Sequence, residues 1–219
     1  PTGTADPFGL RRQALGIIRI ILEKKYPLSL AELIEESESQ LKEKMERDIS
    51  EVKKEVLDFF RIRYQNFLLD KGYPSDVIEA VLSTSFDELL DVQHRMDALR
   101  EAKEWQDFQS IVIGFKRAMN ILKGASYKKE INPSLFSESS EKNLYQSFFK
   151  AKERIGSHLN KRDYPSVLLE MTQLKRPIDE FFDQVMVMVE DEAIRNNRLA
   201  LLDEIGQLFL RIADFSKLM

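Results

Sequence analysis

The sequence has no cysteine and few glycines, and both shortages narrow the chemistry that the chain can perform. The lack of cysteine excludes disulfides, thiolate metal sites, iron–sulfur clusters and thiol nucleophiles, and makes an intracellular chain the simplest interpretation. The 8 glycines among 219 residues are about half of average usage, which argues against a turn-rich all-β fold. They are also too sparse for a G-x-G-x-x-G or Walker loop, so no nucleotide cradle is expected.

Long apolar runs are missing as well. The longest purely apolar stretches, such as residues 185–189, fall far short of the roughly 20 residues that a membrane-spanning helix needs. We therefore expect a soluble, cytoplasmic chain with neither a signal peptide nor a membrane partner. The chain begins at Pro1 without an initiator Met, which indicates a piece of a longer protein.

Charge is nearly balanced overall but unevenly distributed. Lys and Arg number 33 against 37 Asp and Glu, a net charge of −4 at pH 7. Residues 32–58 contain ten acidic and five basic residues, a net of −5, which leaves +1 for the remaining residues. Any nucleic-acid surface is therefore expected outside residues 32–58.

Apolar residues recur at helical spacing, and convincing two-residue alternation is absent. The segments 29–32, 48–51 and 85–88 have the form of N-terminal capping boxes, because each begins with Ser or Asp and ends with Glu. Between 105 and 123, eight apolar side chains fall in one sector of a helical wheel. The pattern predicts an all-α fold.

The helices are expected to form two regions. Short helices with tight joints occupy the first domain, over residues 1–90. Longer helices follow in a second domain over residues 91–219, where they are expected to form an antiparallel bundle.

No catalytic or metal-binding constellation stands out. The only two histidines, His94 and His158, belong to no metal-binding sequence motif, and no G-x-S-x-G nucleophile motif occurs. Asp91 and Asp97 lie three residues either side of His94, a spacing that would suit a metal ion or a proton relay. In a chain with 32% charged residues, local ion pairs on a solvated helix face are the favoured interpretation. We expect neither a catalytic residue nor a metal ligand.

One group of polar residues on the helix over 105–123 is a candidate for RNA contact. Lys116, Arg117 and Asn120 lie within about one turn, so their polar groups can converge on a phosphate or a base edge. A solvent-facing surface opposite the apolar sector explains the same residues equally well.

A second candidate follows in the predicted loop over 124–132. Tyr127, Lys128 and Lys129 combine an aromatic ring with two cations, which suits stacking and phosphate neutralisation on single-stranded RNA. A polar surface loop is the alternative.

Two arginines of the last long helix are expected to face inward. Arg195 and Arg198 fall in the sector of the apolar residues that follow them, and a buried Arg needs a carboxylate or carbonyl partner. Asp191 lies four residues before Arg195 and is the obvious one. We therefore assign Asp191, Arg195 and Arg198 to a structural ion pair, ahead of a role in ligand binding.

Four segments carry a family resemblance: PTGTADPFGLRRQALGIIRI at 1–20, FKRAMNIL at 115–122, FFDQVMVMVEDEAIRNNRLALL at 181–202 and LRIADF at 210–215. In this order, and over nearly the whole chain, they resemble the C-terminal region of the bacterial glycyl-tRNA synthetase beta subunit. The second half is similar to the helical anticodon-binding domain shared with arginyl-tRNA synthetases, which is called DALR after a family motif.

The resemblance implies a division of labour. In that family, two alpha and two beta subunits form a heterotetramer. The alpha subunit carries the adenylate chemistry with ATP and Mg²⁺, and the beta subunit contributes tRNA recognition. This chain would then be a non-catalytic part of the ligase that contacts glycine-specific tRNA, without a cofactor of its own and without DNA as a partner. A structural helical scaffold for subunit or domain assembly is the alternative.

Overall fold

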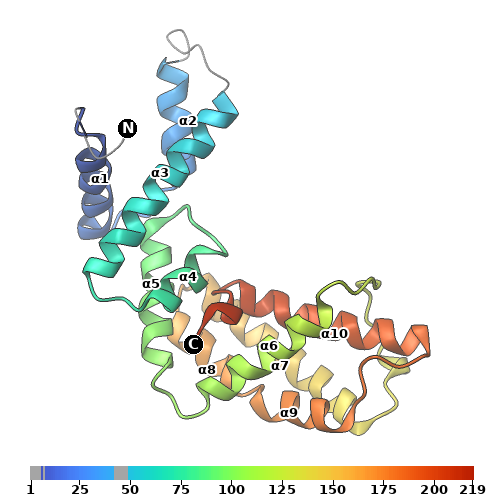
Figure 1. Ribbon diagram of the computed structural model, residues 1–219. Coiled ribbons are helices and arrows are strands. Elements are labelled where there is room, and N and C mark those ends of the chain that lie inside the picture. The colour runs from blue at the N-terminus through green and yellow to red at the C-terminus, as the bar shows by residue number, and fades with distance from the viewer. Residues whose placement is uncertain (1–5, 7, 42–48) are drawn as a thin grey trace. The chain divides into compact units, whose positions relative to one another are not determined.

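The computed structural model describes residue 6, residues 8–41 and residues 49–219 (Figure 1). All regular structure in these residues is helical, and the one β-type contact among them is an isolated antiparallel bridge between Ser29 and Glu88. The all-α prediction is therefore confirmed. No helix of the described part is long and apolar enough to cross a membrane.

The chain forms two compact units, residues 1–96 and residues 97–219, which we call unit 1 and unit 2. The division falls inside helix α5 (Leu89–Ala102). The sequence-based boundary between residues 90 and 91 lies near the start of the same helix. A domain boundary within a helix leaves no loop signal in the sequence, because the helical spacing continues across it.

Unit 1 contains one long helix of 22 residues, α3, beside shorter ones, so the expectation of short helices throughout this region is corrected. Its helices before α5 are α1 (Leu10–Lys24), α2 (Leu30–Leu41), α3 (Ile49–Asp70) and α4 (Ser75–Leu82). Helices α1 and α2 both pack on α3. The side of α3 that faces the start of α5 is closely packed, since Tyr64 is fully buried and its hydroxyl donates to the Leu89 carbonyl at 3.1 Å.

The start of α2 shows how the unit 1 loops are fixed. The Glu32 N–H donates to Ser29 Oγ at 3.0 Å, which is half of the capping box expected there. Asp87 supplies a second cap from far along the chain, because its carboxylate accepts from Ser29 Oγ at 3.0 Å and from the Ala31 N–H at 2.8 Å. Asp48, the expected cap of α3, lies outside the described residues.

Unit 2 is a bundle whose elements follow the expected order. They are α6 (Phe108–Leu122), the 3₁₀ turn η2 (Pro133–Leu135), α7 (Ser139–Asn160), α8 (Tyr164–Thr172), α9 (Lys175–Gln184), α10 (Glu192–Leu210) and the 3₁₀ turn η3 (Phe215–Lys217). Helix α6 begins at Phe108, three residues later than the apolar sector suggested.

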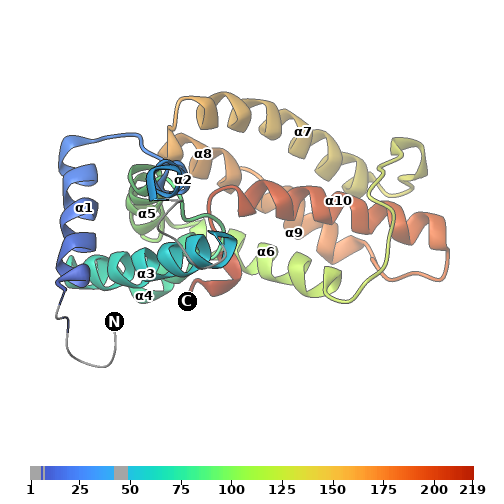
Figure 2. The ribbon, with the colours of Figure 1, turned by 90° about the horizontal axis from the view of Figure 1, so that it is seen from above.

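Helices α6 and α10 form the centre of this bundle and run antiparallel. Phe115 stacks on Phe209 with ring centroids 5.5 Å apart, and Phe215 contacts both rings. The helices approach closely at Gly206, where a Cβ atom would lie 2.8 Å from Met119 Sδ. In Figure 2 the chain between α6 and α7 passes across α10, which brings the predicted RNA-contacting loop onto the last long helix.

Candidate nucleic-acid interface

The two cations of α6 contact different neighbours. Lys116 is half-buried, and its ammonium donates to the Leu218 carbonyl at 2.7 Å. Arg117 lies over the Phe182 ring, 4.4 Å from its centroid, and donates to the Phe182 carbonyl at 3.3 Å. Asn120 is exposed. Lys116 and Arg117 are thus held by different segments rather than converging, because adjacent helical positions point about 100° apart, while Asn120 lies about one turn beyond both.

The loop over 124–132 is attached to α10 at two points, in its middle and at its far end. Gly124 begins it with a φ of +78°, a left-handed conformation that favours glycine. Lys129 Nζ lies 2.9 Å from Asp203 Oδ2. Farther along, the Asn132 N–H donates to Asn197 Oδ1 at 2.7 Å. The loop predicted from sequence is thus an ordered segment with α10 beneath it.

The charges at the start of this loop are set by Asp203. Burial raises the pKa of the Tyr127 hydroxyl, and the nearby Asp203 carboxylate, with which it shares a hydrogen bond, raises that pKa further. The hydrogen bond to Asp203 also raises the pKa of Lys129, whose side chain remains 71% exposed. Lys128 is exposed and makes no hydrogen bond or ion pair within the described part of the chain. Lys128 and Lys129 therefore present two cations to solvent.

The arginines of α10 are structural, but their partners differ from the expected ones. Arg198 is buried, and its Nε lies 2.7 Å from the fully buried carboxylate of Glu141 on α7. Half-buried Arg195 donates to the carbonyls of Val189 and Glu190 at 2.8 and 3.2 Å. Asp191 instead caps α10 by accepting from the Ala193 and Ile194 N–H groups. The expected pairing with Asp191 is corrected, because a carboxylate at the N-cap is used by the free N–H groups of its own helix.

Glu141 joins three segments at one end of the bundle. Its carboxylate accepts from Arg198 and from the backbone N–H groups of Ser137 and Glu138, and Arg198 also donates to the Met186 carbonyl at 2.8 Å. Burial alone would raise the pKa of Glu141, but these hydrogen bonds and the Arg198 charge outweigh it and hold the pKa below its ordinary value. One local signal for this partner is present in the sequence, a Glu three residues after the N-cap position of α7.

The spacing around His94 is occupied by local ion pairs. Asp91 lies 2.9 Å from Arg95, and Asp97 lies 3.3 Å from Arg100, while His94 is exposed. Among the described residues no group of three or more His, Asp or Glu side chains could hold a metal ion. The carboxylates are thus in local ion pairs, but the expected solvated face is corrected, because Arg95 is buried and also donates to Thr84 Oγ1 at 3.2 Å.

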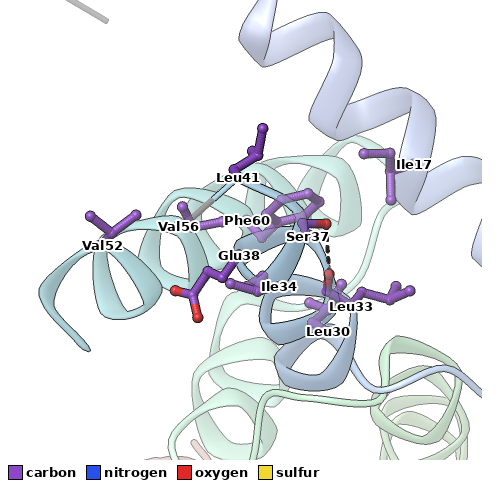
Figure 3. Close-up of a pocket in the computed structure, with 10 residues that line it drawn as sticks. All are labelled: Ile17, Leu30, Leu33, Ile34, Ser37, Glu38, Leu41, Val52, Val56 and Phe60. Carbon is purple, nitrogen blue, oxygen red and sulfur yellow. Dashed lines mark hydrogen bonds between the residues drawn. The ribbon is translucent and has the colours of Figure 1, made fainter. Parts of the chain in front are cut away.

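A second, apolar kind of surface lies in unit 1 (Figure 3). A cavity of about 280 Å³ opens between α1, α2 and α3, and a neighbouring one of about 330 Å³ shares Ile17, Val56 and Phe60 with it. Most of the side chains that line the first of these cavities are aliphatic or aromatic. Its main polar groups are the Ser37 hydroxyl, which donates to the Leu33 carbonyl at 2.8 Å, and the side chain of Glu38. This surface suits apolar packing rather than RNA.

Comparison with known protein families places the two regions separately. The family model for the DALR anticodon-binding domain matches residues 111–214, which is most of unit 2. The family model for the glycyl-tRNA synthetase beta subunit matches residues 1–83. These matches, together with the all-α fold, therefore indicate a DALR-containing part of an aminoacyl-tRNA synthetase.

Similar curated proteins cover the entire chain. A glycine–tRNA ligase beta subunit from Syntrophus aciditrophicus is 48% identical over 218 residues, and those of Geotalea daltonii and Myxococcus xanthus are 45% and 41% identical. Over its whole length the chain is therefore similar to glycyl-tRNA synthetase beta subunits. It spans 31–32% of the length of these relatives.

Proposed function

We propose that this chain is the tRNA-binding part of a glycine–tRNA ligase beta subunit and that unit 2 binds the anticodon region of glycine-specific tRNA. The observation that carries the proposal is the coincidence of the DALR match at 111–214 with the ordered, lysine-bearing loop over 124–132. The catalytic step, with its ATP and Mg²⁺, belongs in this proposal to an alpha subunit in a heterotetramer of two alpha and two beta subunits.

The loop supplies the phosphate contacts. The Lys128 ammonium has no partner among the described residues and is therefore available to an RNA phosphate. Lys129 can exchange its exposed contact with Asp203 for a contact with a phosphate. An RNA loop presents unstacked bases together with phosphates, so cations beside an aromatic ring match its chemistry. Tyr127 provides such a ring, half-buried at the start of the same loop.

The exposed residues of α6 have a secondary role in the proposal. Arg117 presents its guanidinium at the surface of Phe182, where the planar group can stack with a base or contact a phosphate. Asn120 is exposed one turn farther along and has both donor and acceptor groups for a base edge. Lys116 already donates to the Leu218 carbonyl, so its contribution is through charge rather than a free ammonium.

A structural scaffold is the second candidate function. The open apolar cavities of unit 1 favour it, since apolar surface of this kind is normally covered by protein. In this version unit 1 packs against other parts of the synthetase, while the lysines of unit 2 serve only solubility. The two functions are compatible, because they use different units of the chain.

Binding of glycine-accepting tRNA transcript by this chain, measured by filter binding over a range of salt concentrations, tests the proposal. We expect the Lys128→Glu/Lys129→Glu variant to bind more than tenfold more weakly. The slope of log K against log[salt] should fall by about 1.4, because roughly 0.7 is lost per single-strand phosphate contact.

The charge-matched control is Lys24→Glu/Lys25→Glu, a pair of exposed lysines in unit 1. It changes the net charge by the same amount and should leave binding within about twofold. Equal effects of the two variants, or no salt-dependent binding by the unaltered chain, would leave the scaffold as the function.

A further inference from the structure

An aromatic ladder along α7 lies beside the loop over 124–132. The Tyr145 ring contacts Phe136 at 5.4 Å and Phe149 at 4.6 Å between centroids, and Phe149 in turn contacts Phe148 at 5.2 Å. Phe136 and Phe148 are buried, whereas Tyr145 and Phe149 are half-buried and reach the surface. No hydrogen bond to the Tyr145 hydroxyl occurs within the described residues. The buried rings thus support two rings that remain accessible.

A lysine flanks this pair of rings. Lys152 Nζ lies 5.5 Å from the Phe149 centroid and 2.5 Å from Glu204 on α10. Glu204 is the neighbour of Asp203, which holds Lys129 of the loop. Lys152 and Lys129 therefore contact neighbouring carboxylates of α10, one approaching from α7 and the other from the loop. Both ammonium groups are well exposed, so these contacts with carboxylates are easily exchanged.

The contacts of the loop and of α7 with α10 define one continuous surface of unit 2. The loop contacts α10 at Asp203 and Asn197. The chain after the loop reaches α7, where Phe136 contacts the Tyr145 ring. Farther along α7, Lys152 contacts Glu204 and so returns to α10. Figure 2 shows the same course, with the chain between α6 and α7 crossing α10 before α7 begins. The loop and α7 thus both pack against α10, and the three segments form one surface.

The charges on this surface favour RNA over an apolar protein partner. Lys129 and Lys152 offset Asp203 and Glu204, and the loop adds one exposed charge of each sign, Lys128 and Glu130, so the surface is polar and near neutral. Exposed rings beside cations are the combination that holds single-stranded nucleic acid, because the rings stack with bases while the cations contact phosphates. A purely apolar partner would leave these charged groups desolvated.

We propose that Tyr145 and Phe149 form a stacking platform for an unstacked base of the bound RNA loop, with Lys152 and Lys128 on the flanking phosphates. This inference rests on the proposed tRNA-binding function and adds residues of α7 to it. The ligand class is an RNA loop whose bases are turned outward, as in an anticodon loop.

The test uses this chain and an RNA hairpin that carries the anticodon stem and loop of a glycine-accepting tRNA, with 2-aminopurine at one loop position at a time. We expect 2-aminopurine fluorescence to be quenched on binding at the position that stacks. The Tyr145→Leu/Phe149→Leu variant should lose that quenching and bind roughly tenfold more weakly. Its salt dependence should stay the same, because no phosphate contact is removed.

Two controls separate stacking from damage to the fold. Tyr145→Phe/Phe149→Tyr keeps both rings and should bind like the unaltered chain. Tyr26→Leu removes an exposed aromatic ring from unit 1 and should have no effect on binding. If the leucine variant unfolds, photocrosslinking of the unaltered chain to a 5-bromouridine-substituted hairpin replaces it, with Tyr145 or Phe149 as the expected crosslinked residue.

The possible outcomes distinguish this inference from the function on which it rests. Binding of the folded leucine variant within twofold, or crosslinks confined to other residues, would overturn the platform and leave tRNA binding intact. Failure of the unaltered chain to bind either the whole tRNA or the hairpin would overturn both.

Discussion

Units 1 and 2 are both purely helical in their described residues, but they treat apolar surface differently. In unit 2 the aromatic rings of α6 and α10 close on one another, with Phe115, Phe209 and Phe215 at most 2% exposed. In unit 1 the helices α1, α2 and α3 leave open cavities, and large apolar side chains remain exposed on them. These exposed side chains include Phe8, Leu10, Ile17, Ile20, Leu33, Leu41 and Ile62. Helical content alone therefore does not show whether a unit completes its own core.

The units also differ in charge. Unit 1 contains 14 basic and 18 acidic residues, a net of −4, whereas unit 2 contains 19 of each. Unit 2, which is neutral, repels a polyanion such as RNA less than the acidic unit 1 does. Lysines of unit 2 can therefore attract phosphates without a net negative charge that opposes them. We therefore expect unit 1 to contact other molecules through apolar surface and unit 2 through polar groups. The following experiments test whether the two units differ in this way.

The largest stability effect is expected from the buried ion pair of unit 2. Arg198→Ala would leave the Glu141 carboxylate buried without its charged partner and should lower the free energy of unfolding by about 3–5 kcal/mol. Urea unfolding followed by the fluorescence of Trp105, the single Trp and a residue of unit 2, measures this change.

Arg195→Ala is the matched control for that measurement. Arg195 is half-buried and, among the described residues, donates only to backbone carbonyls, so Arg195→Ala should lower the free energy of unfolding clearly less than Arg198→Ala. Equal urea midpoints for Arg198→Ala and the unaltered chain would show that the pair does not stabilise unit 2.

The same pair should make unit 2 sensitive to acid. Because the pKa of Glu141 is lowered in the folded state, the unfolded chain binds the proton more readily. The contribution of Glu141 to stability is therefore complete above its ordinary pKa and is lost as the pH falls through the lower, folded value. We expect the urea midpoint reported by Trp105 to fall over that acidic range. Glu141→Gln should show a flatter pH profile, and an unchanged profile in this variant would assign the acid sensitivity to other groups.

Much of the fold could be predicted from the sequence because it depends on local signals. Helical spacing gave the all-α class and the order of the elements, and the apolar sector between 105 and 123 located α6 to within three residues. The inward position of Arg198 also followed from its place among apolar residues on the helical wheel. These features need only the periodicity of a single helix.

The candidate site was less predictable because its contacts join distant segments. Glu141 is 57 residues from Arg198 in the sequence, and helices α7, α8 and α9 lie between Lys129 and Asp203 in chain order. No local spacing encodes such partners. The nearness of Asp191 to Arg195 in the sequence instead led to the prediction of an ion pair that the structure does not contain. The aromatic pair Tyr145 and Phe149 did have a local signal, a separation of four residues on one helix face, but packing explains that spacing equally well.

The smallest effect that we predict concerns the polar contacts of unit 1. Asp87→Ala removes two hydrogen bonds at the start of α2 and should lower the free energy of unfolding by about 1 kcal/mol, the usual value for a lost helix cap. Far-UV circular dichroism during urea unfolding would report the loss, while the Trp105 signal from unit 2 should stay unchanged. Asp87→Asn keeps an acceptor oxygen and should recover most of the stability. A shift of the Trp105 midpoint by Asp87→Ala would show that the two units do not unfold independently, and the comparison between them would then have to be made on the chain as one cooperative structure.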